Sequence, residues 1–190
     1  MAEVLLFHHA QGLTGGVLSF AGTLRDAGHT VHTPDLYDGH TFAVLDDGVA
    51  YARQTGFDKI SEAGVRTADD LPAGIVYAGF SLGVMPAQQL AQTRPGCHGA
   101  LFFHSCLPAA EFGSWPADVP VQIHSMDADP YFVDDGDIDA ARALVNATTQ
   151  AEMFLYPGAE HLFADPTLTS YDAEATEVLT RRVLDFLSAR

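Results

Sequence analysis

Short β-type runs alternate along the chain with longer segments in which apolar residues recur every three or four positions. The runs predict six strands, at residues 4–7, 29–33, 75–77, 99–104, 119–124 and 151–156. Helices are predicted at residues 17–24, from behind Ser81 to about residue 94, at 137–146 and at 172–187. Strands that alternate with helices imply right-handed βαβ units, and therefore an α/β fold with a mostly parallel sheet covered by helices on both faces.

The pattern is weakest in residues 36–71, where clusters of apolar residues predict two short helices joined by polar segments. Asp137 is predicted to be the N-cap of the helix at residues 137–146, because a carboxylate there can accept a backbone N–H. Asp134 and Asp135 are expected in a solvated loop before it. The length of 190 residues fits one domain with a sizeable core.

The predicted strand at residues 75–77 leads into Gly79-Phe-Ser81-Leu-Gly83, which fits the G-x-S-x-G pattern of a nucleophile elbow. There a serine sits on a strained turn between a strand and a helix. Glycines are needed on both sides because a Cβ would clash with neighbouring backbone. The helix that starts behind Ser81 directs free N–H groups at any oxyanion formed there. The motif therefore predicts a nucleophilic serine.

Composition narrows the classes of partner. The net charge of −16 would repel nucleic acid and anionic membranes, so neither is expected as a partner. Cys97 and Cys106 are too few for a disulfide framework and are expected to be buried, reduced thiols. The first residues enter a strand pattern without a basic segment, and no apolar run reaches membrane-spanning length, so a cytoplasmic protein is expected.

A serine hydroxyl needs a histidine base whose second ring nitrogen is held by a carboxylate. In parallel sheets the polar groups of a site gather at the carboxyl ends of the strands. Beyond the elbow, His124 and His161 lie near such ends. His161 follows the last strand in a loop and is expected to be the base, whereas His124 still lies within a strand pattern and is expected to be a half-buried structural side chain.

The carboxylate is expected after the fifth strand, where Asp127 and Asp129 are both candidates. The oxyanion of a tetrahedral intermediate also needs N–H donors. One donor is expected to be the backbone N–H of Leu82. The second should come from the loop after the first strand, from Ala10 or Gln11.

Together these motifs resemble the dienelactone hydrolase family of α/β-hydrolases, in a minimal form without a lid. The resemblance covers nearly the whole chain and is weakest at residues 36–71. Beyond the elbow it rests on Thr33-Pro-Asp-Leu-Tyr37, His124-Ser-Met-Asp-Ala-Asp-Pro-Tyr131, Tyr156-Pro-Gly-Ala-Glu-His-Leu-Phe163 and the closing Arg182-Val-Leu-Asp-Phe-Leu187. It implies a catalytic triad of Ser81, Asp129 and His161. It favours Asp129 over Asp127 because Asp129 precedes a proline–aromatic pair, and it implies that Ala10 is the second oxyanion donor.

Three positions depart from the founding members of that family. Ser81 stands where they have a cysteine nucleophile, His9 where they have a glutamate, and Asp165 where they have an arginine that helps bind the substrate carboxylate. A carboxylate at the last position would repel an anionic lactone. The fold and the hydrolytic chemistry are therefore expected to carry over, whereas dienelactone as the substrate is not.

The resulting prediction is a serine hydrolase that cleaves small carboxylic esters or lactones through an acyl-enzyme, without a cofactor, as a monomer or homodimer. Thioester hydrolysis or acyl transfer by the same triad is an alternative, and so is a non-catalytic small-molecule-binding module that has kept the fold. The substrate pocket is expected to be lined by His9, Gln11, Phe80 and Tyr131. His8 and His9 could begin a metal site with His104 or Asp35. Nothing in the sequence makes three ligands converge there, so no metal is expected.

Overall fold

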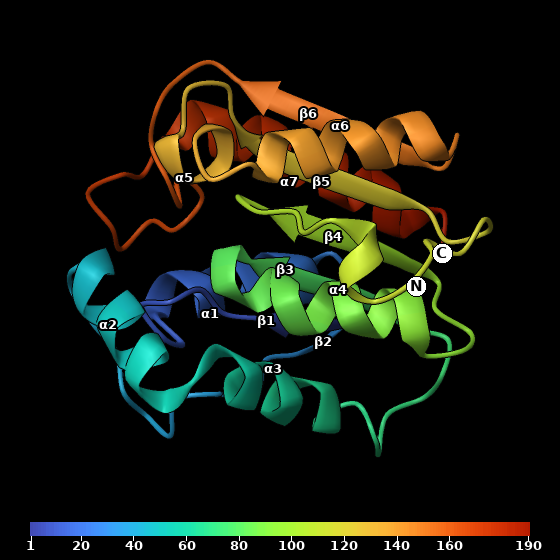
Figure 1. Ribbon diagram of the computed structural model, residues 1–190, viewed down its shortest axis with the longest axis horizontal. Coiled ribbons are helices and arrows are strands. Elements are labelled where there is room, and N and C mark those ends of the chain that lie inside the picture. Colours follow the sequence, from blue (N-terminus) through green and yellow to red (C-terminus); the bar gives the residue numbers. More distant parts are fainter.

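The computed structural model describes residues 1–190 and places one sheet between two layers of helices (Figure 1). The strands are β1 (Glu3–Phe7), β2 (Thr30–His32), β3 (Val76–Phe80), β4 (Gly99–Phe103), β5 (Val121–Met126) and β6 (Ala151–Tyr156). They pair in the order β2-β1-β3-β4-β5-β6, and every pair is parallel. The predicted α/β fold is confirmed.

The helices are α1 (Gly15–Asp26), α2 (Leu45–Thr55), α3 (Phe57–Arg66), α4 (Val84–Thr93), α5 (Pro130–Val133), α6 (Asp137–Ala147) and α7 (Ala173–Ser188), with short 3₁₀ helices η1 (Ser81–Gly83) and η2 (Ala109–Glu111). Residues 36–71 contain the two short helices predicted there, α2 and α3. No helix combines the length and the apolar character needed to cross a bilayer.

Alternating strand residues divide the core into two layers. Val4 and Leu6 of β1 belong to a cluster with apolar residues of α1 and α7, whereas Leu5 and Phe7 belong to a second cluster with residues of α4 and α6. Figure 1 shows the same division, with α4 and α6 in front of the sheet and α1 and α7 behind it. Strands covered on both faces in this way need continuous apolar sequence, which explains why these runs could be recognised.

The chain passes from β1 to β2 on one side and then to β3 on the other side of β1. The loops that follow β1 and β3 therefore diverge at a topological switch point, where open α/β sheets bind ligands. Helices α2 and α5 lie at this carboxyl end of the sheet (Figure 1). The two chain termini lie together at the opposite end, where the Met1 amino group donates to the carbonyl of Arg190 at 3.2 Å.

The predicted N-cap of α6 is wrong. Gly136 is the N-cap, and Asp137 is the first helical residue. The Asp137 carboxylate instead accepts hydrogen bonds from the Ser105 hydroxyl at 2.5 Å and the Cys106 N–H at 3.0 Å. Burial raises the pKa of this carboxyl above its usual value. A contact with the loop after β4 therefore takes precedence over the local capping preference.

Candidate active site

Ser81 occupies the sharp turn between β3 and α4. Its φ of +48° lies in the left-handed region, which costs an ordinary residue roughly 1–2 kcal/mol. A Cβ on Gly79 would overlap the carbonyl group of Gly83, and a Cβ on Gly83 would lie 2.6 Å from the carbonyl oxygen of His8. The two flanking glycines are therefore required by close backbone approach, as the sequence pattern predicts, and the strained residue is the serine itself.

Ser81, His161 and Asp129 form one chain of hydrogen bonds, although 80 residues separate Ser81 from His161. His161 Nε2 lies 2.9 Å from Ser81 Oγ, and His161 Nδ1 lies 2.7 Å from Asp129 Oδ2. Because an ionised carboxylate only accepts hydrogen bonds, His161 donates from Nδ1, and its Nε2 is free to accept the Ser81 proton. The structure thus brings the three residues together in the arrangement that activates a serine.

Each member of this chain follows a different strand. Ser81 follows β3, Asp129 follows β5 as the N-cap of α5, and His161 lies in the loop after β6. Asp129 is completely buried, and its Oδ1 accepts the Tyr131 N–H at 3.0 Å, which fixes the orientation of the carboxylate. Asp127 points elsewhere and accepts the Gly158 N–H at 3.1 Å.

His124, the other histidine weighed as a base, is a structural residue within β5. Its Nδ1 lies 2.9 Å from the hydroxyl of Tyr156, and the side chain is fully buried rather than half-buried as predicted. Burial lowers its pKa to about 3, so the ring is neutral near pH 7.

Of the two candidate oxyanion donors in the loop after β1, only one has a free backbone N–H. The Gln11 N–H donates to His9 Nδ1 at 3.2 Å, whereas the N–H of buried Ala10 has no acceptor within the protein. Leu82 follows Ser81 within η1, in a first helical turn whose N–H groups lack helical partners. Of the two candidates in this loop, Ala10 rather than Gln11 is therefore available to bind an oxyanion.

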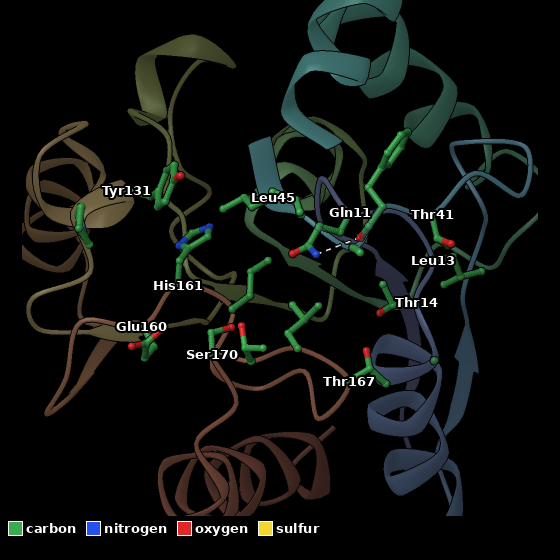
Figure 2. A pocket seen from close by; sticks show the side chains of 18 of the residues that line it. Gln11, Leu13, Thr14, Thr41, Leu45, Tyr131, Glu160, His161, Thr167 and Ser170 are labelled. Carbon is green, nitrogen blue, oxygen red and sulfur yellow. Dashed lines mark hydrogen bonds between the residues drawn. The ribbon is translucent and has the colours of Figure 1, made fainter. Parts of the chain in front are cut away.

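A cavity of about 910 Å³ opens beside His161 (Figure 2). Figure 2 shows Tyr131 and His161 on one side of it and Thr14 and Thr167 on the other. Its lining contains none of the nine lysine and arginine side chains, and Glu160 is its only carboxylate. Burial and the nearby Asp46 raise the pKa of the Tyr131 hydroxyl above its usual value, so this tyrosine is neutral. The cavity can hold a drug-sized molecule but offers no cation to bind an anionic group.

The four residues expected to line the pocket separate into two pairs. Gln11 and Tyr131 line the cavity. The structure places His9 and Phe80 elsewhere, with buried side chains. Phe80 stacks on Phe103 at a centroid distance of 4.6 Å, and His9 Nε2 lies 2.9 Å from an Asp165 oxygen. Asp165 is itself buried and hydrogen-bonded and does not line the cavity, so it offers no direct contact to a substrate there, and its repulsion of an anionic substrate stays a prediction.

The other histidines do not form a metal site. No group of three or more His, Cys, Asp or Glu side chains is arranged to hold a metal ion. His8 uses both ring nitrogens, since Nδ1 donates to the His9 carbonyl at 2.8 Å and Nε2 accepts the Leu36 N–H at 3.0 Å. Burial lowers its pKa to about 4.

Two features of the site were not predicted from the sequence: how His104 packs against His161, and which loops form the cavity wall. His104, after β4, has a φ of +65° and packs edge-on against His161, and both of its buried ring nitrogens lack partners. Burial holds its pKa well below the usual range. Residues 41–45 and 167–170 form much of the cavity wall. No motif marks these loop residues, because their positions depend on how distant loops meet.

The chain as a whole matches a known family. The model of the dienelactone hydrolase family matches residues 1–190. Among solved structures, a dienelactone hydrolase-like promiscuous phosphotriesterase from metagenomic libraries is 21% identical, with a TM-score of 0.77 over 100% of this chain and 86% of that chain. A cold-adapted esterase from an Arctic intertidal metagenomic library is 18% identical, with a TM-score of 0.62 over 95% and 82% of the two chains.

A third similar structure, of the esterase PE8, is 16% identical, with a TM-score of 0.68 over 98% of this chain and 93% of that chain. No curated protein sequence matches the chain. The TM-scores of these three structures support a shared α/β-hydrolase fold, and the family match extends over every residue. The chain belongs to the dienelactone hydrolase family, and this membership makes it an ester hydrolase.

Proposed function

We propose that the protein is a serine hydrolase that cleaves small, uncharged carboxylic esters or lactones through an acyl-enzyme. The observation that carries the proposal is the hydrogen-bonded chain from Ser81 Oγ through His161 to Asp129, with distances of 2.9 and 2.7 Å. It lies at the cavity, because His161 is one of the cavity-lining residues. This arrangement is the one that serine hydrolases on unrelated folds use for acyl transfer.

In the first half of the reaction, Ser81 Oγ attacks the ester carbonyl while its proton moves to His161 Nε2. Asp129 stabilises the imidazolium through the bond to Nδ1. The N–H groups of Ala10 and Leu82 bind the oxyanion of the tetrahedral intermediate. When the intermediate collapses, the carbon–oxygen bond to the alcohol breaks, and His161 gives its proton to the departing oxygen.

In the second half, water attacks the acyl-enzyme and gives a proton to His161. The second tetrahedral intermediate expels Ser81 Oγ, which takes that proton back, and the carboxylic acid leaves. Atoms and charge balance without a metal or an organic cofactor, so none is assigned. Both halves use the same oxyanion donors, because both intermediates carry the negative charge on the same carbonyl oxygen.

The charges around the cavity support an uncharged substrate. A carboxylate would have to leave water for a cavity with no lysine or arginine, beside Glu160 and close to Asp46. Like charges without a compensating cation disfavour such a substrate. The hydroxyl groups of Thr41, Thr169 and Ser170 offer hydrogen bonds to a neutral polar substrate instead.

The test is hydrolysis of 4-nitrophenyl acetate and butyrate by the wild type and by Ser81→Ala. The proposal predicts that the wild type releases a burst of nitrophenol and that Ser81→Ala retains a rate lower by roughly 10⁴-fold or more. Equal rates for the two proteins would refute it. Adding thiol or alcohol acceptors during turnover separates hydrolysis from acyl transfer, because transfer yields a new ester or thioester. Ligand binding without turnover over a panel of esters and thioesters would favour a non-catalytic binding module.

A further inference from the structure

Asp165 is a buried carboxylate that joins three separate segments of the chain. Oδ2 accepts from His9 Nε2 at 2.9 Å and from the Thr14 hydroxyl at 2.5 Å. Oδ1 accepts from the Thr167 N–H at 2.8 Å and from the Thr167 hydroxyl at 2.6 Å. These bonds hold the pKa of Asp165 down at about 2 despite its burial, so it is ionised wherever the protein is folded near neutral pH. The triad chemistry makes no use of this charge.

The Asp165 carboxylate fixes the tautomer of His9. Since an ionised carboxylate accepts only, His9 must carry its proton on Nε2, which leaves Nδ1 as an acceptor. His9 Nδ1 in turn accepts the Gln11 N–H at 3.2 Å. The negative charge of Asp165 therefore acts through the His9 ring, because it makes His9 Nδ1 the acceptor to which the Gln11 N–H is bonded.

The peptide groups around Ala10 are held on their other side by α2. A Cβ on Gly48 would overlap the carbonyl oxygen of Ala10, so the helix backbone packs directly against this carbonyl. The loop is also closed by a bond from the Gly12 N–H to the His9 carbonyl at 3.0 Å. With its carbonyl against α2 and the next N–H turned to His9, Ala10 has a backbone N–H that is left without a partner in the protein.

We propose that Asp165 and His9 act as a buried positioning pair that holds the loop of residues 9–12 in the conformation in which the Ala10 N–H is free to bind the oxyanion. The inference rests on the proposed function, because it concerns how the oxyanion site of that reaction is formed. Neither side chain touches the substrate, so both act on the transition state through the backbone. The unusual histidine and aspartate at these two positions are thereby explained as one hydrogen-bonded unit.

One substitution at His9 and one at Asp165 test the pair from its two sides. In His9→Gln the amide nitrogen can take the place of Nε2 and donate to Asp165, but no acceptor atom then lies at the Nδ1 position to receive the Gln11 N–H. Asp165→Asn tests the same link from the other side with an isosteric change. The Thr167 N–H selects the amide oxygen at the Oδ1 position, so the amide NH₂ group faces His9 Nε2. His9 must then accept at Nε2 and carry its proton on Nδ1, where it can no longer accept the Gln11 N–H. His124→Gln is the matched control, because His124 is equally buried but lies in β5 and bonds to Tyr156 and Gln122.

Each variant is assayed with a 4-nitrophenyl ester and with the matching thionoester, whose sulfur is a weak hydrogen-bond acceptor. Removing one oxyanion donor costs about 10²–10³-fold in kcat, so a misplaced donor in His9→Gln is expected to lower kcat for the oxygen ester by roughly ten- to hundredfold with KM nearly unchanged. The thionoester rate should fall much less, so that the ratio of the two rates shrinks. Asp165→Asn should show the same pattern with a smaller loss, and His124→Gln should leave the ratio unchanged.

Folded fractions are measured by near-ultraviolet circular dichroism and by active-site titration with a fluorophosphonate. The inference is overturned if folded His9→Gln or Asp165→Asn keeps the wild-type kcat, or if the oxygen ester and the thionoester lose rate equally, which indicates a general structural role. Should His9→Gln fail to fold, the isosteric Asp165→Asn decides. Absence of ester hydrolysis by the wild type would instead refute the proposed function, and the positioning role with it.

Discussion

Replacing Asp129 by asparagine tests the triad through the orientation of one amide group. In the native protein Oδ1 accepts the Tyr131 N–H at 3.0 Å and Oδ2 lies 2.7 Å from His161 Nδ1. In Asp129→Asn the Tyr131 N–H selects the amide oxygen at the Oδ1 position, so the amide NH₂ group faces His161. His161 must then accept at Nδ1 and carry its proton on Nε2, where it can no longer take the Ser81 proton.

The expected loss for this wrong tautomer is roughly 10⁴-fold in kcat, or about 5 kcal/mol in the activation free energy. The assay is steady-state hydrolysis of 4-nitrophenyl acetate near pH 7. Asp127→Asn is the control: Asp127 accepts a single Gly158 N–H, which an amide oxygen can also accept, so its activity should stay within about threefold of the wild type. If Asp129→Asn retained activity within about tenfold of the wild type, the assigned tautomer and the role of Asp129 would be refuted.

Three further outcomes follow from the structure. A Cβ on Gly83 would lie 2.6 Å from the His8 carbonyl oxygen, so Gly83→Ala should lower the free energy of unfolding by roughly 1–3 kcal/mol. The loss should appear as a lower midpoint of urea unfolding, and an unchanged midpoint would contradict this close approach. Because no cation lines the cavity, the anionic 4-nitrophenyl hemisuccinate should be cleaved with a kcat/KM roughly tenfold below that of 4-nitrophenyl butyrate. Glu160→Gln should reduce this difference in kcat/KM, and equal kcat/KM values for the two esters in the wild type would exclude electrostatic selection. Folding lowers the pKa of His124 from 6.5 to about 3, so the free energy of unfolding is highest above pH 6.5 and decreases as the pH falls from 6.5 towards 3. In His124→Phe this decrease, measured by urea unfolding, should be smaller by up to roughly 5 kcal/mol, and an unchanged pH dependence would refute a buried neutral ring.

The sheet and the elbow could be predicted because their signals are local. Apolar runs long enough to cover both faces of a strand predict a buried parallel sheet, and Gly79-Phe-Ser81-Leu-Gly83 specifies a turn that only small flanking residues permit. His161 could be selected because it follows the last strand, where a parallel sheet directs its loops to one edge. Placing these residues at one end of the sheet requires only the alternation of strands and helices.

The rest depends on contacts between segments far apart in the sequence. Local rules make Asp137 a helix cap, yet the side chain turns to Ser105 and Cys106, 32 and 31 residues away. Asp165, read alone, is an unpaired negative charge. Its partner His9 lies 156 residues away in the sequence, and their hydrogen bond makes both residues part of a buried network instead of the substrate pocket. The cavity wall likewise combines loops from distant parts of the chain, and no hydrophobic periodicity in the sequence indicates that these loops lie together.

The most direct test of the account is to identify the residue that a fluorophosphonate labels. The enzyme is treated with the reagent, digested, and analysed by peptide mass spectrometry, with Ser81→Ala treated in parallel. The account predicts a single adduct on Ser81, complete loss of ester hydrolysis in proportion to labelling, and no adduct in Ser81→Ala. An adduct on another residue, or an unlabelled Ser81 in a protein that still hydrolyses esters, would contradict the claim that Ser81, His161 and Asp129 form the catalytic centre.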